Sequence, residues 1–133
     1  MASELKVDKF TGVTTAGSID VTGEGNSTTT NLQQGLAKAW SYSGLNDNTI
    51  DDSFNTASLT DHGTGTVSHN FTNSFSSANH CNVALIGTAA HVFFNGSDAA
   101  KSSSTTGNFR CYNTSNSFSD PSDINIISTG DLA

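Results

Sequence analysis

The stretch TVSHNFT at residues 66–72 decides the fold class, because apolar and polar positions alternate along it. Val67, His69 and Phe71 fall on one face of an extended chain, while the other face carries only hydroxyl and amide side chains. This pattern is typical of a half-buried strand in an antiparallel sheet. The residue types of Asp61 to Gly65, just before it, predict a hairpin turn.

The next candidate strand, CNVALI at residues 81–86, is apolar on both faces. Cys81, Val83 and Leu85 form the main apolar face, and the opposite face ends in Ile86. A strand that faces water on one side does not need two apolar faces. We therefore expect cover on both sides of this strand.

Further short candidate strands follow the same period, separated by tracts rich in Gly, Ser, Asn and Pro that break pairing. They are residues 50–54, 57–60, 91–95, 109–113 and 124–128. Several short strands at such spacing are typical of a sandwich or a small barrel. We predict an all-β domain over residues 31–133, an antiparallel β-sandwich of about seven strands.

Residues 1–30 differ from the rest and are predicted to form an extended N-terminal arm and linker. Their apolar residues are isolated between polar ones, with no long patch to bury. Residues 23–30 read as a polar linker, because glycines and hydroxyl side chains dominate them. The arm offers Leu5, Val7, Phe10, Ile19 and Val21 as candidate attachment residues.

One short helix is the only helical candidate, within residues 31–40. Leu32, Leu36 and Trp40 lie four apart and would share one helix face. Gly35 weakens this interpretation, because a glycine inside a helix costs about 1 kcal/mol relative to alanine. A segment this short needs packing, so its Leu32/Leu36 face is expected to contact either its own domain or a neighbouring subunit.

Composition limits the possible partners. Charged residues make up 13% of the 133 residues, and the net charge is −7. So few cations argue against binding to nucleic acid or to an anionic membrane. Val, Ile, Leu and Phe are also scarce, which predicts a thin core that oligomerisation would complete.

The sequence also favours synthesis in a cytosol without classical export or membrane insertion. No apolar run has the length of a signal peptide or a membrane span. In a reducing cytosol, Cys81 and Cys111 are expected to be free, buried thiols.

Neither a cofactor nor catalysis has positive support from motifs. The four histidines lack the close spacing of a metal site, and the acidic group Asp47, Asp51, Asp52 and Asp61 lies in a turn-rich segment where carboxylates commonly cap backbone amides. Two facing carboxylates could cleave a glycosidic bond, which leaves a depolymerase as one alternative. We expect a protein that is not an enzyme and holds no metal or cofactor.

The order of several motifs resembles a β-rich module in structural proteins of tailed bacteriophages, notably marine ones. The motifs are QQGLAKAW at 33–40, DSFN at 52–55, ASLTD at 57–61 with its Gly-Thr-Gly turn, residues 67–72, and, in the arm, SELKVDK at 3–9 and TAGSI at 15–19. The resemblance implies a non-enzymatic virion component, trimeric and exposed on the particle. The short chain favours a capsid decoration or a small fibre-type appendage.

In this interpretation the protein's partners are copies of itself and other virion proteins. Attachment would use the arm residues and the Leu32/Leu36 face, because an extended arm can add strands to a partner while alternate side chains fill its pockets. The alternative is a receptor-binding tip for a host surface glycan. Its candidate ligand residues are Trp40 and Tyr42 as stacking platforms, with Asp51 and Asp52 nearby.

Overall fold

The structure is a computed structural model that describes residues 4–12, 19–22, 29–87, 91–95 and 101–132. The chain divides into two compact units, Met1–Leu36 and Ala37–Ala133. The division falls after Leu36, whereas the sequence placed the boundary after residue 30. Residues 29–36 belong with the first unit because their strand pairs with its first strand and their helical turn follows directly.

The first unit contains a small two-stranded antiparallel sheet and one helical turn. Strand β1 (Asp20–Thr22) pairs with β2 (Thr29–Asn31), and α1 (Leu32–Gly35) follows directly. The backbone N–H of Leu32 donates to the carbonyl oxygen of Ile19 at 2.8 Å, which joins the helical turn to the segment before β1. The helix is therefore a single turn attached to a hairpin.

The helical face expected from Leu32, Leu36 and Trp40 does not form. The helix ends at Gly35, the glycine that weakened the expectation, and Trp40 lies in a strand. The backbone of Trp40 pairs on both sides with other strands, so sheet pairing in the second unit outweighs the local helical pattern.

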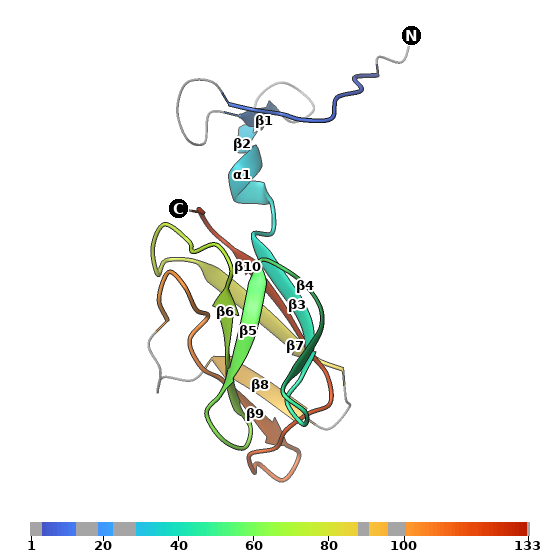
Figure 1. Cartoon of the computed structure of the whole chain (residues 1–133), viewed down its shortest axis with the longest axis vertical. Coiled ribbons are helices and arrows are strands. Elements are labelled where there is room, and N and C mark those ends of the chain that lie inside the picture. The colour runs from blue at the N-terminus through green and yellow to red at the C-terminus, as the bar shows by residue number, and fades with distance from the viewer. Residues whose placement is uncertain (1–3, 13–18, 23–28, 88–90, 96–100, 133) are drawn as a thin grey trace. The chain divides into compact units, whose positions relative to one another are not determined.

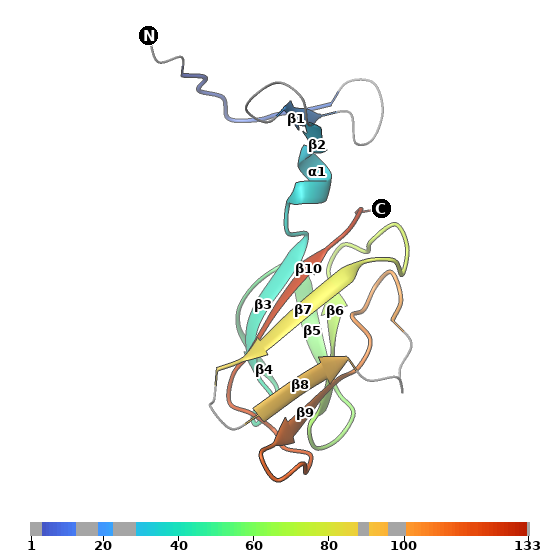
Figure 2. The ribbon, with the colours of Figure 1, turned by 180° about the vertical axis from the view of Figure 1, so that it is seen from behind.

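The second unit consists of two four-stranded antiparallel sheets, which confirms the predicted class of an antiparallel β-sandwich. One sheet has the order β4-β3-β10-β7, and its strands are β4 (Thr49–Phe54), β3 (Ala39–Gly44), β10 (Ile124–Thr129) and β7 (Cys81–Ile86). The other has the order β5-β6-β9-β8, with β5 (Thr56–Asp61), β6 (Thr66–Phe71), β9 (Phe109–Asn113) and β8 (His91–Asn95). In Figure 1, β5 of the second sheet lies nearer the viewer than β7 of the first. In Figure 2, which shows the opposite side, β7 lies nearer the viewer than β5 and β6. The unit is therefore a sandwich-like, all-β structure.

The sandwich has eight strands because β3 joins the seven predicted ones. The helical candidate within residues 31–40 covers the start of this strand, although residues 39–44 alternate like a strand. Ala39, Ser41 and Ser43 are buried, whereas Trp40 and Tyr42 are exposed. The strand lacks apolar alternation because small hydroxyl side chains occupy its buried face, so its sequence pattern did not predict it.

The core between the sheets is small and partly polar. Its main cluster is Val67, Phe109, Cys111, Ile124 and Ile126, and a second one is Ala39, Phe71 and Phe75. Polar side chains are buried among them, namely Ser41, Ser43, His69, Thr106 and Ser128. The predicted inward face of β6 is confirmed, since Val67, His69 and Phe71 are all buried.

The corner at which the chain passes from the first sheet to the second is held by Asn55. Its backbone is left-handed, with φ of 58°, a conformation that asparagine tolerates better than most residues. Its side-chain Nδ2 donates to the carbonyl oxygens of Lys38 and Asn73 at 3.0 and 3.1 Å, and its Oδ1 accepts from the N–H of Asn73 at 2.7 Å. One amide side chain thus ties three separate segments together.

Candidate functional site

The outer face of the β4-β3-β10-β7 sheet carries a row of exposed apolar side chains. In the strand register, Trp40 lies opposite both Phe54 and Ile127, and Ile127 lies opposite Val83. Each of the four strands contributes one large apolar side chain to this row. All four are exposed, from 37% for Trp40 to 59% for Val83.

A second row lies beside the first and mixes apolar and polar groups. Tyr42 lies opposite Asp52 on one side and Asn125 on the other, and Asn125 lies opposite Leu85. Leu85 is 68% exposed, the most exposed apolar side chain on this sheet. We use the term apolar face for Trp40, Tyr42, Phe54, Val83, Leu85 and Ile127.

The main apolar face of strand β7, formed by Cys81, Val83 and Leu85, is turned away from the core. Ala84 and Ile86 pack against the core, whereas Val83 and Leu85 are exposed. Two apolar faces compete for the core, and the register with Ile124 and its neighbours decides between them. Within the described chain the expected cover is present on the face of Ala84 and Ile86 alone. Cys81 shares the outward face and is exposed, so the expectation of two buried thiols holds only for Cys111.

The predicted ligand residues separate into two groups. Trp40, Tyr42 and Asp52 come together on the outer face of the first sheet. Asp51 is exposed but has no register partner on β3, because the register shifts there and Tyr42 pairs with Asp52 while Ser43 pairs with Ile50. The bulge therefore brings Asp52, and not Asp51, beside the tyrosine. In addition, Asp52 Oδ1 accepts a hydrogen bond from the N–H of Ser53 at 2.8 Å.

The predicted attachment residues of the arm all lie in the first unit. Most of them are exposed, and these are Leu5, Val7, Phe10, Val21 and Leu36. The other two, Ile19 and Leu32, are half-buried. The arm thus presents apolar side chains to solvent.

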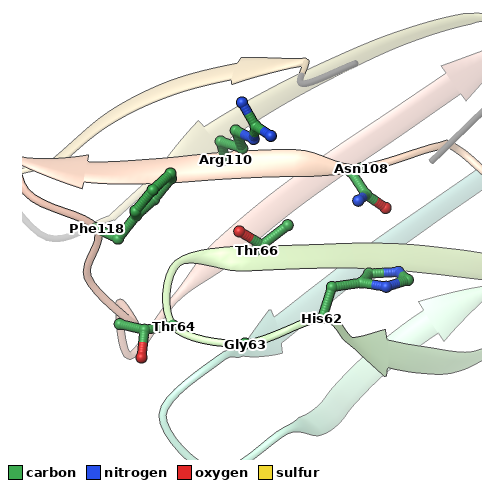
Figure 3. A pocket seen from close by; sticks show the side chains of 7 residues that line it. All are labelled: His62, Gly63, Thr64, Thr66, Asn108, Arg110 and Phe118. Atoms are coloured by element: carbon green, nitrogen blue, oxygen red, sulfur yellow. The ribbon is translucent and has the colours of Figure 1, made fainter. Parts of the chain in front are cut away.

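A pocket of about 460 Å³ opens on the outer side of the second sheet (Figure 3). Its lining comes from the β5–β6 hairpin turn, from the strands β6 and β9, and from the segments just before and after β9. The lining residues are His62, Gly63, Thr64, Thr66, Asn108, Arg110 and Phe118. Thr66 and Arg110 are register partners, and their chain neighbours Val67 and Phe109 point into the core, so alternation directs this pair outward.

One wall of the pocket is an aromatic ring next to a cation. The guanidinium carbon of Arg110 lies 5.9 Å from the ring centroid of Phe118, a cation–π distance. Phe118 also packs against Tyr112, with ring centroids 4.6 Å apart, and is still 46% exposed. The wall therefore offers positive charge and a flat apolar surface side by side.

Amide, hydroxyl and imidazole groups form the rest of the lining. Asn108 is only 3% exposed, and its Oδ1 has no hydrogen-bond partner among the described residues. His62 Nε2 shares a hydrogen bond with Ser68 Oγ at 2.9 Å, which fixes the orientation of the ring. The pocket thus combines hydrogen-bonding groups with the charged wall.

Sequence reasoning missed this pocket. Its residues come from two stretches that are distant along the chain, 62–66 and 108–118, and only the fold brings them together. One signal was present, since Arg110 is the only arginine of an acidic chain and lies within an alternating strand pattern. An isolated cation on a strand face is weak evidence until its neighbours are known.

Two buried side chains with strongly shifted pKa values, His69 and Cys111, lie outside both the apolar face and the pocket. Burial lowers the pKa of His69 to about 4, and its Nδ1 shares a hydrogen bond with Ser41 Oγ at 2.9 Å across the two sheets. Burial, with a smaller contribution from Asp120, raises the pKa of the Cys111 thiol to about 12. Both groups are held neutral in the core, which suits packing and not proton transfer.

Other features that would indicate a function are missing from the described part of the chain. Its His, Cys, Asp and Glu side chains nowhere gather in a group of three or more that could hold a metal ion. None of its helices has the length and apolar character needed to cross a membrane. No protein-family model, curated protein or solved structure matches the chain.

Proposed function

We propose that this protein is a non-enzymatic structural protein of a bacteriophage virion, exposed on the particle as a capsid decoration or a small fibre-type appendage. It assembles with copies of itself through the apolar face of the sandwich and attaches through its N-terminal arm. The apolar face is the observation that carries this proposal. The motif resemblance to phage structural modules supplies the biological setting.

The size of the apolar face supports self-association. A buried aromatic side chain hides roughly 150–250 Å², so the exposed parts of these six side chains together amount to roughly 600 Å². A stable interface buries about 800 Å² per partner. With the polar groups at its rim, the face supplies most of that area, and leaving such a patch in water is unfavourable.

The thin core supports the same conclusion. Several positions between the sheets are occupied by serine and threonine, which contribute little hydrophobic stabilisation. Covering the apolar face with a second copy adds the burial that the interior lacks. The two apolar faces of β7 fit this arrangement, because one faces the core and the other would face a neighbour.

A trimer with closed symmetry would cover the apolar face of every copy. Three copies around a common axis can each turn the β4-β3-β10-β7 sheet toward the axis, so that the same patch is buried in every copy. The opposite sheet and its pocket then remain on the outside. The arm is a separate compact unit and is available for contacts with other virion proteins.

The oligomeric state tests the role of the apolar face. Light scattering of the purified full chain is expected to give a trimer, and the double variant Val83→Asp/Leu85→Asp is expected to give a monomer with unchanged circular dichroism. Both positions are exposed, so the substitutions add charge to the interface without disturbing the core. Thr72→Asp, an exposed position outside the strands, is the matched control and should remain trimeric. A wild-type monomer at all concentrations would contradict the proposal.

Incorporation into virions tests the role of the arm. Deleting residues 1–22 should leave the sandwich folded, because its two sheets lie within the second unit. The deletion should strongly reduce the copy number in purified particles, as measured by quantitative mass spectrometry. Particles that carry the truncated chain at the normal copy number would remove the arm from this account.

A second candidate function is binding of a host surface glycan on the same face. The observation that favours it is the placement of Trp40 and Tyr42 on one exposed strand face with Asp52 opposite the tyrosine. Aromatic rings beside a carboxylate are a common platform for neutral sugars. Binding on a glycan array that is lost in Trp40→Ala and Tyr42→Ala would favour this function. Loss of the trimer in the same variants, without any glycan signal, would favour assembly.

A further inference from the structure

The pocket beside Arg110 lies on the sheet opposite the apolar face, and neither assembly nor the arm explains it. A fold that needed only to assemble would have no use for a cation, an aromatic ring and several hydrogen-bonding groups gathered around one cavity. The volume of about 460 Å³ lies within the range of small-molecule sites. Figure 3 shows the side chains that line the pocket, with Phe118 toward one end, Asn108 and His62 toward the other, and Thr66 between them.

The charge of the lining selects for an anion. Arg110 carries a permanent positive charge, and no carboxylate is among the lining residues. The two nearest acids along the lining segments are engaged by the backbone, since Asp61 Oδ1 accepts from the N–H of Gly63 and Asp120 Oδ1 from the N–H of Gly65, at 2.7 and 2.6 Å. Both carboxylates keep their negative charge, so the attraction for an anion within the lining itself comes from Arg110.

The remaining groups select for a ring that carries hydroxyls. Phe118 offers an exposed aromatic surface, on which the C–H face of a sugar can pack. Thr64 and Thr66 supply hydroxyl groups, and Asn108 supplies an amide whose oxygen lacks a partner in the described structure. A buried acceptor left without a donor costs about 1–3 kcal/mol, so a ligand hydroxyl that reached it would be favoured.

We propose that this pocket binds a carboxylate-bearing sugar, such as a uronic acid residue of a polysaccharide. The guanidinium group of Arg110 binds the carboxylate, Phe118 packs on the apolar face of the ring, and the threonines with Asn108 hydrogen-bond to its hydroxyls. The assignment does not depend on the virion role, because the pocket and the apolar face belong to opposite sheets.

Titration of the full chain with small probes tests the assignment. Glucuronate is expected to bind in isothermal titration calorimetry and to shift the backbone amide signals of Gly63, Thr64 and Thr66 in NMR spectra. Glucose, which lacks the carboxylate, and acetate, which lacks the ring, should each bind about tenfold more weakly or worse. If glucose bound as tightly as glucuronate, the role of Arg110 would be overturned. If acetate bound as tightly as glucuronate, the pocket would be a simple anion site and the sugar assignment would be wrong.

Single variants distinguish the contribution of the Arg110 cation to binding from that of the Phe118 ring. Arg110→Gln should weaken glucuronate binding by about tenfold or more and leave the weak glucose binding unchanged. Phe118→Ala should weaken glucuronate and glucose alike. Lys9→Gln, which removes one positive charge from the arm, is the matched control and should bind like the wild type. Wild-type binding by both pocket variants, or shifts confined to other residues, would overturn the proposal.

Discussion

His69 shows how one buried polar residue links the two sheets. Its ring lies in the core, makes an edge contact with Phe109 at 6.4 Å between centroids, and shares a hydrogen bond with Ser41 of the opposite sheet. Its backbone N–H donates to Thr106 Oγ1 and its carbonyl oxygen accepts from the N–H of Thr106, both at 3.0 Å. The residue therefore acts as a polar bridge in an otherwise thin interior.

We predict that acid weakens the fold through His69. The native state keeps the ring neutral down to a pKa of about 4, whereas the unfolded chain binds a proton below about 6.5. This contribution to stability is fully present above pH 6.5 and is lost as the pH falls toward 4. Between pH 7 and pH 5 the loss amounts to about 2 kcal/mol, measured by urea unfolding.

Two variants isolate this effect. His69→Gln should lose most of the pH dependence in that interval, while His62→Gln, which changes an exposed ring, should keep it. The ring signals of His69 in NMR spectra provide a test without substitution. If they titrate near pH 6.5 in the folded protein, the prediction is wrong.

The two thiols are predicted to differ sharply in reactivity. Cys111 is fully buried and its pKa is raised to about 12, so little thiolate forms at pH 8. In the variant Cys81→Ser, which leaves Cys111 as the only thiol, maleimide labelling should be negligible in the native protein and complete in denaturant. Rapid native labelling would show that the core around β9 opens readily.

At the scale of single elements, strands were predictable wherever one face was clearly apolar. Strand β6 was identified because Val67, His69 and Phe71 share a face, while β3 was missed because its inner face carries Ser41 and Ser43. The direction of β7 could not be read from its sequence, since both faces are apolar and the register with β10 selects one. Local pattern thus located the elements, and pairing settled their orientation.

The hairpin turn between β5 and β6 is predicted to tolerate an alanine at one glycine and not at the other. Both glycines have a positive φ, 108° at Gly63 and 68° at Gly65. A Cβ at Gly65 would lie 2.6 Å from the carbonyl oxygen of Cys111, whereas one at Gly63 would meet no atom within 4 Å. Gly65→Ala should therefore cost about 3 kcal/mol and Gly63→Ala about 1 kcal/mol, measured by thermal unfolding. Equal losses would mean that backbone conformation alone sets the cost.

At the scale of the whole molecule, the fold class followed from the sequence and the candidate surfaces did not. The apolar face depends on a register that places Phe54, Trp40, Ile127 and Val83 in one row, although they come from four distant segments. The sequence had singled out Trp40 and Tyr42 as ligand residues without their apolar neighbours. Which side chains share a surface is a property of strand order, and strand order is not encoded in local periodicity.

Stability is predicted to depend on protein concentration. If copies complete the burial that the core lacks, unfolding is coupled to dissociation, and each tenfold dilution should lower stability by about 1 kcal/mol per chain. Calorimetric scans of the wild type over a hundredfold range should show the melting temperature falling with dilution. The double variant at Val83 and Leu85 should melt at a lower temperature that does not change with concentration. A wild-type melting temperature independent of concentration would mean that the sandwich stands alone.

The opposite placement of the apolar face and the Arg110 pocket has a consequence for particles that carry many copies. If copies on a particle turn their apolar faces inward, as proposed, every pocket would point outward and the particle surface would become a dense array of identical sites. Weak individual sites in such an array act together, and avidity can exceed the single-site affinity by about 10²–10⁴ when several engage one polymer. Adhesion to an acidic capsule or slime layer would then be strong yet reversible, because each contact can exchange without releasing the rest.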